Sequence, residues 1–195
     1  MPYIELDATE VRSTFGRKWI VSGVIEAFCV NMEALLREIG DLETKVCNSF
    51  FADKIGLSKP IVFTARDAYQ QVRRWFKACR ASGNKLKRIV LAINVSQLHW
   101  IGACVDFRRK TVEICDALWL QGCENGELPP LPEGCTHYKN EALNRAVADY
   151  ERLLDVLGHE WTSQQERGFL EGPLDPNEWR LKITPIGDGG RSQLI

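Results

Sequence analysis

The residues best suited to carry out chemistry are a histidine and an aspartate, His99 and Asp116, at the ends of two predicted strands. The apolar segments around them flank a short polar stretch, as the two arms of a β-hairpin do. If the turn is centred between Phe107 and Arg108, the antiparallel register places His99 directly opposite Asp116, with Cβ atoms about 4.5–5.5 Å apart. A carboxylate beside an imidazole orients a general base and fixes its tautomer.

The same register predicts a continuous apolar strip next to this pair, which indicates a buried sheet face with the pair at its rim. A second interpretation stays open, because a cross-strand ion pair is often a surface contact that contributes less than about 1 kcal/mol. Spacing alone does not separate the two. The residues of the predicted strip are Ile101, Ala103, Val105, Val112 and Ile114.

The composition fits one globular domain with a sizeable core. The chain has 195 residues, of which 45% are hydrophobic, and a formal net charge of −1. This near-neutral balance gives no overall reason to expect a nucleic-acid or membrane partner. No apolar run approaches the ~20 residues of a membrane span, and the first residues do not have the pattern of a signal peptide.

The seven cysteines are scattered through apolar runs, and none forms a Cys-x-x-Cys pair. An odd number of dispersed thiols predicts reduced, buried cysteines in an intracellular protein of the nucleus or cytoplasm. Cys123, Cys135 and His137 lie close together in the sequence, but their spacing matches no zinc motif. We therefore expect neither a metal nor another cofactor.

Apolar residues at steps of three and four predict helices over Lys18–Ile39, Ala65–Arg80 and Tyr138–Leu157, with the last one closed by Gly158. A second short element, Lys45–Ile55, carries its own apolar stripe. We expect both N-terminal stripes to pack into the core. Their members are Trp19, Val24, Ile25, Phe28, Met32, Leu35 and Leu36 in the first, and Val46, Phe50, Phe51 and Ile55 in the second.

Strand patterns cover Arg88–Val95, the two hairpin arms and Glu178–Ile186, and Pro60–Thr64 is a candidate short strand. Segments rich in Gly, Pro and polar residues predict loops over Trp119–Cys135 and His159–Asn177. The order of two helices, three strands, a helix and a strand argues for an α+β fold rather than repeated βαβ units.

A basic segment between positions 73 and 88 has no acidic residue. A basic helix with interleaved aromatics can bind a phosphate backbone, although a solvated face has the same pattern and Trp75 and Phe76 are needed in the core. Nucleic-acid binding is therefore the least favoured of three candidate functions. The basic residues are Arg73, Arg74, Lys77, Arg80, Lys85, Lys87 and Arg88.

The succession of segments resembles the SUMO/ubiquitin-like-protein-specific cysteine proteases, whose relatives include the adenovirus protease. The resemblance covers about residues 15–192. It implies a papain-like α+β fold with a central, mostly antiparallel sheet flanked by helices, in a single catalytic-type domain over residues 1–195. The segments that carry it are KWIVSGVIEAF, NSFFADKI, VRRWF, IVLAINVSQLHWIGACVD, with Asn94 before His99-Trp100, and VEICDAL, with Asp116-Ala117-Leu118.

By this resemblance His99 is the general base and Asp116 the residue that orients it. Trp100, together with Trp19, is expected to bind the C-terminal tail of a ubiquitin-like modifier of the SUMO type. The implied reaction is hydrolysis of the peptide or isopeptide bond that follows the modifier's C-terminus.

The chain departs from the family pattern Gln-x-Asp-Gly-x-x-Cys-Gly. Alignment on Asp188-Gly189 places Ile186 at the position of the oxyanion-hole glutamine and Ser192 at that of the nucleophilic cysteine. A serine hydroxyl is much harder to ionise than a thiol, whose pKa is normally about 8.5. Loss of one oxyanion donor typically costs about 10²–10³ in rate. We also expect the C-terminal helix that supports the nucleophile to be missing.

The sequence therefore predicts a cysteine-type peptidase by family that is inactive as written. It leaves two explanations open: an incomplete form of a working enzyme, or a degenerate member that keeps the scaffold. The alternative function, from another class, is a non-catalytic module that binds a ubiquitin-like protein.

Overall fold

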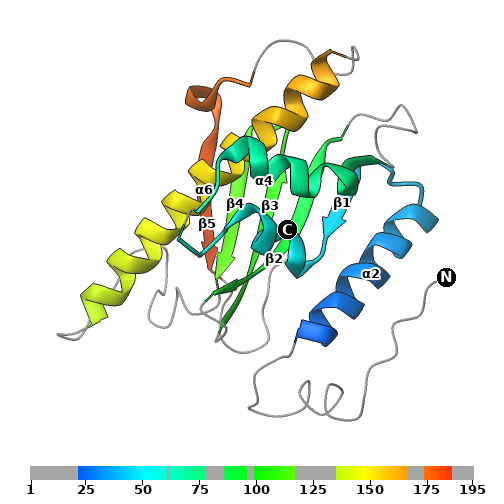
Figure 1. Ribbon diagram of the computed structural model, residues 1–195. Helices are drawn as coiled ribbons and strands as arrows, with labels where there is room; N and C mark the ends of the chain where they lie inside the picture. The colour runs from blue at the N-terminus through cyan, green and yellow to red at the C-terminus, as the bar shows by residue number, and fades with distance from the viewer. Residues whose placement is uncertain are drawn as a thin grey trace.

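A computed structural model describes residues 22–60, 62–77, 86–95, 99–116, 135–166 and 174–185 (Figure 1). Within these ranges the chain forms helices and a single five-stranded sheet. The helical elements are α2 (Ser22–Glu38), α3 (Ser49–Ile55), α4 (Ala65–Val72), the 3₁₀ turn η1 (Arg73–Phe76), α6 (Cys135–Gln165) and the 3₁₀ turn η3 (Pro176–Glu178). The strands are β1 (Thr44–Cys47), β2 (Arg88–Val95), β3 (His99–Asp106), β4 (Thr111–Asp116) and β5 (Arg180–Pro185).

The sheet has the spatial order β1-β2-β3-β4-β5. Its two central pairs, β2–β3 and β3–β4, are antiparallel, and the second of them is the predicted hairpin. Its two outer pairs, β1–β2 and β4–β5, are parallel, so the sheet is mixed rather than antiparallel throughout. The α+β class is confirmed. Because only β3 runs against the others, the carboxyl ends of four strands lie at the same end of the sheet as the start of β3.

One face of the sheet forms the main hydrophobic core with α3, α4 and α6. Along β2, buried and half-buried residues alternate, which is typical of a strand with one face in the core. Figure 1 shows α4 and α6 crossing the packed face. The predicted strip of the hairpin is buried there, with Val105 and Val112 fully inaccessible and Ile101, Ala103 and Ile114 nearly so.

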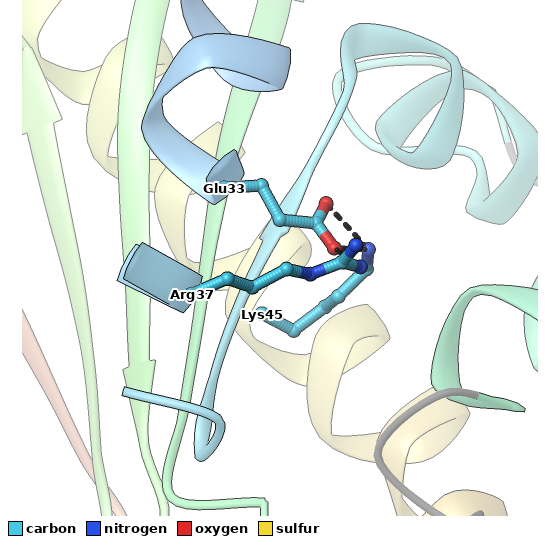
Figure 2. A network of polar contacts seen from close by, with 3 residues as sticks. All are labelled: Glu33, Arg37 and Lys45. Carbon is cyan, nitrogen blue, oxygen red and sulfur yellow. Dashed lines mark hydrogen bonds and ion pairs between the residues drawn. The ribbon is translucent and has the colours of Figure 1, made fainter. Parts of the chain in front are cut away.

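The N-terminal part contains one strand that the sequence reading missed. The segment predicted as one element over Lys45–Ile55 is in fact β1 followed by α3, which Asn48 caps by accepting a hydrogen bond from the Phe51 backbone N–H at 3.3 Å. Four residues are too few to show an alternating pattern. Figure 2 shows how α2 is attached to this strand: Glu33 accepts from Lys45 Nζ at 2.6 Å and from Arg37 Nη2 at 2.6 Å.

Two members of the predicted N-terminal core stripes are exposed on α2. Phe28 is 59% and Leu35 is 51% exposed, so the prediction that they pack in the core is wrong. The side of α2 that packs against the domain instead carries Ala27 and Cys29, which are both buried. A helix that is apolar on two sides gives no sequence signal of which side is covered.

The long helix α6 continues past Gly158, where the sequence predicted its end, so its last turns replace the start of the predicted loop 159–177. The buried stripe of Leu153, Leu154 and Leu157 continues at Trp161, which is 7% exposed. Burial of this indole outweighs the roughly 1 kcal/mol that a glycine costs inside a helix.

Polar side chains on α6 hold the connection between α3 and α4. Arg152 donates from Nε to the Ile55 carbonyl at 2.7 Å and from Nη2 to the Phe63 carbonyl at 3.0 Å. Asp149 accepts from the N–H of Ser58 at 2.6 Å and from its hydroxyl at 2.8 Å, which fixes Ser58 at a positive φ of 53°. Residues 62–64 form no strand, contrary to the prediction, because this connection is shaped by α6 and not by the sheet. No helix in the described ranges is long and apolar enough to cross a membrane.

Candidate active site

The turn of the β3–β4 hairpin lies one residue further along the chain than the sequence predicted. The last pair of the ladder is Asp106 with Thr111, so four residues, 107–110, form the turn. Asp106 Oδ1 accepts from the Arg109 backbone N–H at 2.8 Å, and Lys110 adopts a left-handed conformation with φ 51°. Four-residue hairpin loops of this kind are common.

This turn shifts the predicted register by two residues. Gly102 pairs with Cys115, and continuing that ladder by one residue places Ile101, not His99, opposite Asp116. The predicted direct opposition of His99 and Asp116 is therefore wrong. Because the shift is even, both positions stay on the same face of the sheet, in a diagonal relation for which spacings of about 7–8 Å are usual. The side chains of His99 and Asp116 lie outside the described part of the structure.

The register is set by an aromatic cluster that the sequence reading did not find. Phe107, in the turn, is only 7% exposed. Its ring stacks on Trp161 of α6 at 5.5 Å and meets Trp179 edge-on at 5.6 Å. Burial of a phenyl ring stabilises the folded state by about 1.5–3 kcal/mol, which is enough to determine which residues form the turn. Strand alternation alone could not reveal a tertiary contact with a helix 54 positions further along, from Phe107 to Trp161.

The sheet topology brings the predicted pair to the end of β5. His99 begins β3 and is paired with Val95, the last residue of β2. Asp116 ends β4 and is paired with Pro185, the last residue of β5. His99, Asp116 and the end of β5 therefore lie at one end of the sheet. They are the positions predicted for the base, for the carboxylate that orients it, and for the segment that leads to the nucleophile. Ile186, Ser192 and Trp19 lie outside the described residues.

Trp100 lies on the other face of the sheet from His99, because neighbouring strand residues alternate. It is half-buried and paired with Asn94 of β2. The Asn94 Oδ1 atom is buried without a hydrogen-bond partner. Such an orphaned acceptor is uncommon in folded proteins and identifies a place where a donor from a ligand would be stabilised.

A second exposed aromatic was missed as a candidate because the sequence placed it in the core. Phe50 is 55% exposed, whereas Phe51 beside it is fully buried. Phe50 is the second residue of α3, which follows the carboxyl end of β1. The backbone there is held by Glu26, whose Oε1 accepts from the Ser49 N–H at 2.9 Å and from its hydroxyl at 2.5 Å.

The cysteines with a resolved pKa shift are unsuited to nucleophilic chemistry. Burial, and then the carboxylates of Glu26 and Glu33, raise the pKa of the Cys29 thiol to about 11. Burial also raises the pKa of Cys104 and of Cys115. A reactive cysteine needs the opposite shift. Among the described residues no group of three His, Cys, Asp or Glu side chains could hold a metal ion.

The basic segment is partly neutralised by acidic neighbours. Lys87 forms an ion pair with Glu43, and Arg88 Nη2 lies 3.5 Å from Asp41. Arg74 stacks over the Trp75 ring at 4.6 Å. Positions 78–85, which include Arg80 and Lys85, lie outside the described residues. A phosphate backbone would compete with these contacts, which weakens the nucleic-acid hypothesis.

Comparison with known proteins gives a consistent result over most of the chain. Residues 18–166 match the sequence profile described as the Ulp1 protease family, C-terminal catalytic domain. The chain is 29% identical over 115 residues to Ubiquitin-like-specific protease 1 of Saccharomyces cerevisiae, an alignment that covers 59% of this chain and 16% of that protein. The chain therefore spans only a small part of this curated relative.

Two solved structures have the same fold. One is the SUMO protease Ulp1 with its catalytic cysteine oxidised to a sulfinic acid, with a TM-score of 0.59 at 21% identity. The other is the C-terminal Ulp1 protease domain in complex with Smt3, the yeast orthologue of SUMO, with a TM-score of 0.57 at 23% identity. Each comparison covers 96% of this chain and 66% of the other chain.

Proposed function

The chain belongs to the Ulp1 protease family, and on that premise we propose that it is a Ulp1-type domain that recognises a SUMO-type ubiquitin-like modifier but hydrolyses its conjugates poorly or not at all. The family reaction is that of a cysteine-type peptidase or isopeptidase. The observation that carries the proposal is the register of β2, β3, β4 and β5, which gathers His99, Asp116 and Pro185 at one end of the sheet.

In this proposal His99 is the general base and Asp116 orients its imidazole. Positions in a diagonal relation on two antiparallel strands remain within reach of extended side chains. A hydrogen bond from the imidazole to the carboxylate would fix the tautomer and stabilise the cation that forms when the base takes a proton. The same pair would lower the pKa of a thiol placed beside it, which is how such a site activates cysteine.

The missing component is the nucleophile. The sequence motif Asp188-Gly189 predicts Ser192 at the position of the family's cysteine and Ile186 at that of the glutamine that stabilises the oxyanion. The described thiols with resolved shifts have raised pKa values and cannot substitute. A hydroxyl nucleophile without that amide donor would lose at least about 10²–10³ in rate from the oxyanion hole alone.

Recognition of the modifier is the part of the function that we expect to persist. The exposed Phe50 and the half-buried Trp100, which lies on the other face of the sheet from His99, offer apolar contacts. The unpaired Asn94 Oδ1 beside Trp100 could accept a hydrogen bond from the backbone of an extended C-terminal tail. We assign tail binding to Trp100 and to Trp19. The second candidate function, a purely non-catalytic binding module, rests on these same groups.

The setting that this function requires is intracellular, and we propose the nucleus or cytoplasm. Cys29 is a buried free thiol, and Cys104 and Cys115 are half-buried free thiols. Free, buried cysteines are typical of reducing compartments.

Turnover of a SUMO C-terminal fluorogenic substrate tests the catalytic half of the proposal. We expect no release of the fluorophore above the buffer rate, and no difference between the chain and its His99→Ala variant. Appreciable turnover that His99→Ala abolishes would overturn the claim of an impaired enzyme.

The double variant Ser192→Cys with Ile186→Gln tests the assigned positions. We expect it to be labelled by a SUMO carrying an electrophilic C-terminus, because a thiol and the amide donor are then restored. The Ser192→Cys/Ile186→Gln/His99→Ala triple variant is the matched control and should be labelled at least about tenfold more slowly. Equal labelling of both would contradict the role of His99.

A further inference from the structure

The last strand, β5, lies at the edge of the described sheet and is paired with β4 alone among its strands (Figure 1). Parallel pairs such as this one are slightly less stable per residue than antiparallel pairs. Asp116 ends β4 and is paired with Pro185, which ends β5. The segment assigned to the nucleophile follows Pro185 in the sequence. A contact that holds the carboxyl end of β5 therefore bears on the proposed active site.

Burial holds the start of β5. Trp179, just before the strand, is only 6% exposed. Its ring meets Phe107 at 5.6 Å and Trp161 at 6.4 Å, both edge-on. The Arg180 N–H also donates to the Lys110 carbonyl at 2.9 Å. A displacement of this end would pull a large indole out of its cluster, so the start of the strand is firmly fixed.

Burial holds the carboxyl end of β5 less well. The core-facing side chains of Leu181 and Ile183 are half-buried, whereas Val112 and Ile114, their partners on β4, are almost inaccessible. Pro185 has no backbone N–H to donate to the ladder. The apolar contacts at this end are therefore weaker than those at the start.

Glu113 of β4 supplies a polar contact at this end. Its Oε1 atom accepts from Lys182 Nζ at 2.9 Å and from the Thr184 hydroxyl. Lys182 lies directly opposite Glu113, and Thr184 lies two residues nearer the end of β5. One carboxylate thus bonds two successive side chains on the same face of the edge strand.

The bond to Thr184 is the stronger of the two. The Thr184 hydroxyl lowers the pKa of Glu113 the most and Lys182 lowers it further, although burial opposes the shift. The carboxyl is therefore ionised at neutral pH, and a hydrogen bond to an ionised acceptor is about twice as strong as a neutral one. The Lys182 side chain is 63% exposed, so solvent screens its ion pair, whereas Thr184 is half-buried.

We propose that Glu113 is a positioning residue for the active site, a role that rests on the function proposed above. By holding Thr184 it fixes Pro185 beside Asp116, so that the chain leaves β5 at one place and the assigned nucleophile meets His99. Strand residues rise about 3.3 Å each, so a displacement by even one residue exceeds the tolerance of a catalytic contact. Glu113 lies on the opposite face of the sheet from Asp116, so it acts only through β5.

Labelling by a SUMO with an electrophilic C-terminus tests this role in the Ser192→Cys/Ile186→Gln background. We expect Glu113→Ala and Thr184→Val each to lower the maximal labelling rate at least about tenfold. The SUMO concentration that gives half the maximal rate should change less than about twofold, because binding is not affected. The two substitutions together should be no slower than either alone, since they break the same bond.

Glu178→Ala is the matched control. Glu178 forms an ion pair with Lys110 at the other end of β5, where Trp179 already holds the strand. This variant should be labelled like the background. Unchanged labelling with Glu113→Ala, an equal loss with Glu178→Ala, or a change confined to the half-maximal concentration would each overturn the proposal.

Hydrogen exchange in the otherwise unaltered chain separates a failure of this proposal from a failure of the proposed function. Glu113→Ala and Thr184→Val should speed exchange of the protected amides of residues 182–184 at least about tenfold and leave those of β2 unchanged. Unchanged exchange would overturn the role of Glu113 whatever the labelling shows. A background that is not labelled at all would overturn the proposed function and, with it, the catalytic part of this role.

Discussion

The two long helices of this protein differ in the kinds of side chain that they bury and expose. α6 buries charged side chains: Asp149 is 3%, Arg152 5% and Glu160 0% exposed. α2 exposes the large apolar residues Phe28 and Leu35. Both contradict the simple rule that apolar residues lie inside, and for different reasons. The polar groups of α6 have partners within the domain, whereas Phe28 and Leu35 of α2 are more than half exposed.

The difference indicates what each helix is for. Buried charge is tolerated only where hydrogen bonds replace those lost to water, so α6 acts as the internal brace of the fold. Glu160, for example, accepts from the Tyr69 hydroxyl of α4 at 2.8 Å. The outer side of α2 leaves large apolar side chains in contact with water, so it contributes little to the core.

The largest effect on stability is expected at Arg152. The Arg152→Ala variant leaves the carbonyls of Ile55 and Phe63 without their donor inside the protein. We expect a loss of about 3 kcal/mol in the free energy of unfolding, measured by urea denaturation. Arg66→Ala, on the exposed side of α4, should change it by less than about 0.5 kcal/mol. An equal loss of unfolding free energy in Arg152→Ala and Arg66→Ala would show that the hydrogen bonds of α6 do not stabilise the fold in this way.

The second largest effect on stability is expected at Asp149. The Asp149→Ala variant should lose about 2 kcal/mol in the free energy of unfolding, because Ser58 is held at positive φ by two hydrogen bonds to this carboxylate. Ser58→Gly is the matched control: it removes one bond but relieves the backbone conformation, so it should cost less. A loss at Ser58→Gly as large as that at Asp149→Ala would contradict this account.

The same carboxylate predicts a pH dependence. Burial raises the pKa of Asp149 above its usual value of 3.8, although the bonds from Ser58 and the charge of Arg145 oppose the shift. Since the folded state then binds the proton more tightly than the unfolded state, this group stabilises the fold below the unfolded pKa and loses that contribution as pH rises through the folded pKa. The stability of the parent chain relative to Asp149→Asn should therefore fall from pH 3.8 upward. A rise over that interval would contradict the raised pKa.

A smaller effect is expected for the attachment of α2 to the sheet. Glu33→Gln removes the charge that pairs with Lys45 and Arg37, and we expect a loss of about 1 kcal/mol, since Lys45 is mostly buried while Arg37 is exposed. Differential scanning calorimetry at low and high salt separates the two partners. Restoration by a second substitution, Lys45→Met, would confirm that the uncompensated lysine is the cause.

The smallest effect is expected on the outer side of α2. Leu35→Gln should change the stability of the monomer by less than about 0.5 kcal/mol, because the side chain is already in water. Ala27→Gln, on the inner side of the same helix, should cost more than about 2 kcal/mol by overpacking and burial of an amide. Both are measured by urea unfolding. A large loss at Leu35 would mean that its exposed surface is covered within the monomer.

The sequence predicted the three central strands, because their apolar residues alternate and turn residues separate them. It placed His99 and Asp116 on one face correctly, since an error of two residues in register does not change the face. It could not predict the register itself, because Phe107 is held by Trp161 and Trp179, which are distant in the sequence.

The remaining errors have similar causes. The sequence predicts the end of α6 at Gly158 because glycine usually ends helices, whereas Trp161 continues the buried stripe. The exposed Phe28, Leu35 and Phe50 were assigned to the core because periodicity shows which residues share a side and not what covers that side. The roles of His99, Asp116, Trp100, Trp19, Ser192 and Ile186 remain predictions.

Calorimetric titration of the chain with a SUMO-type modifier tests the central claim most directly. We predict saturable binding that persists at about 0.5 M salt, is lost with a modifier that lacks its C-terminal tail, and is weakened at least about tenfold by Trp100→Ala. The Phe28→Gln variant, on the outer side of α2, should bind normally. Absence of binding by the parent chain, or binding that ignores both the tail and Trp100, would contradict the account.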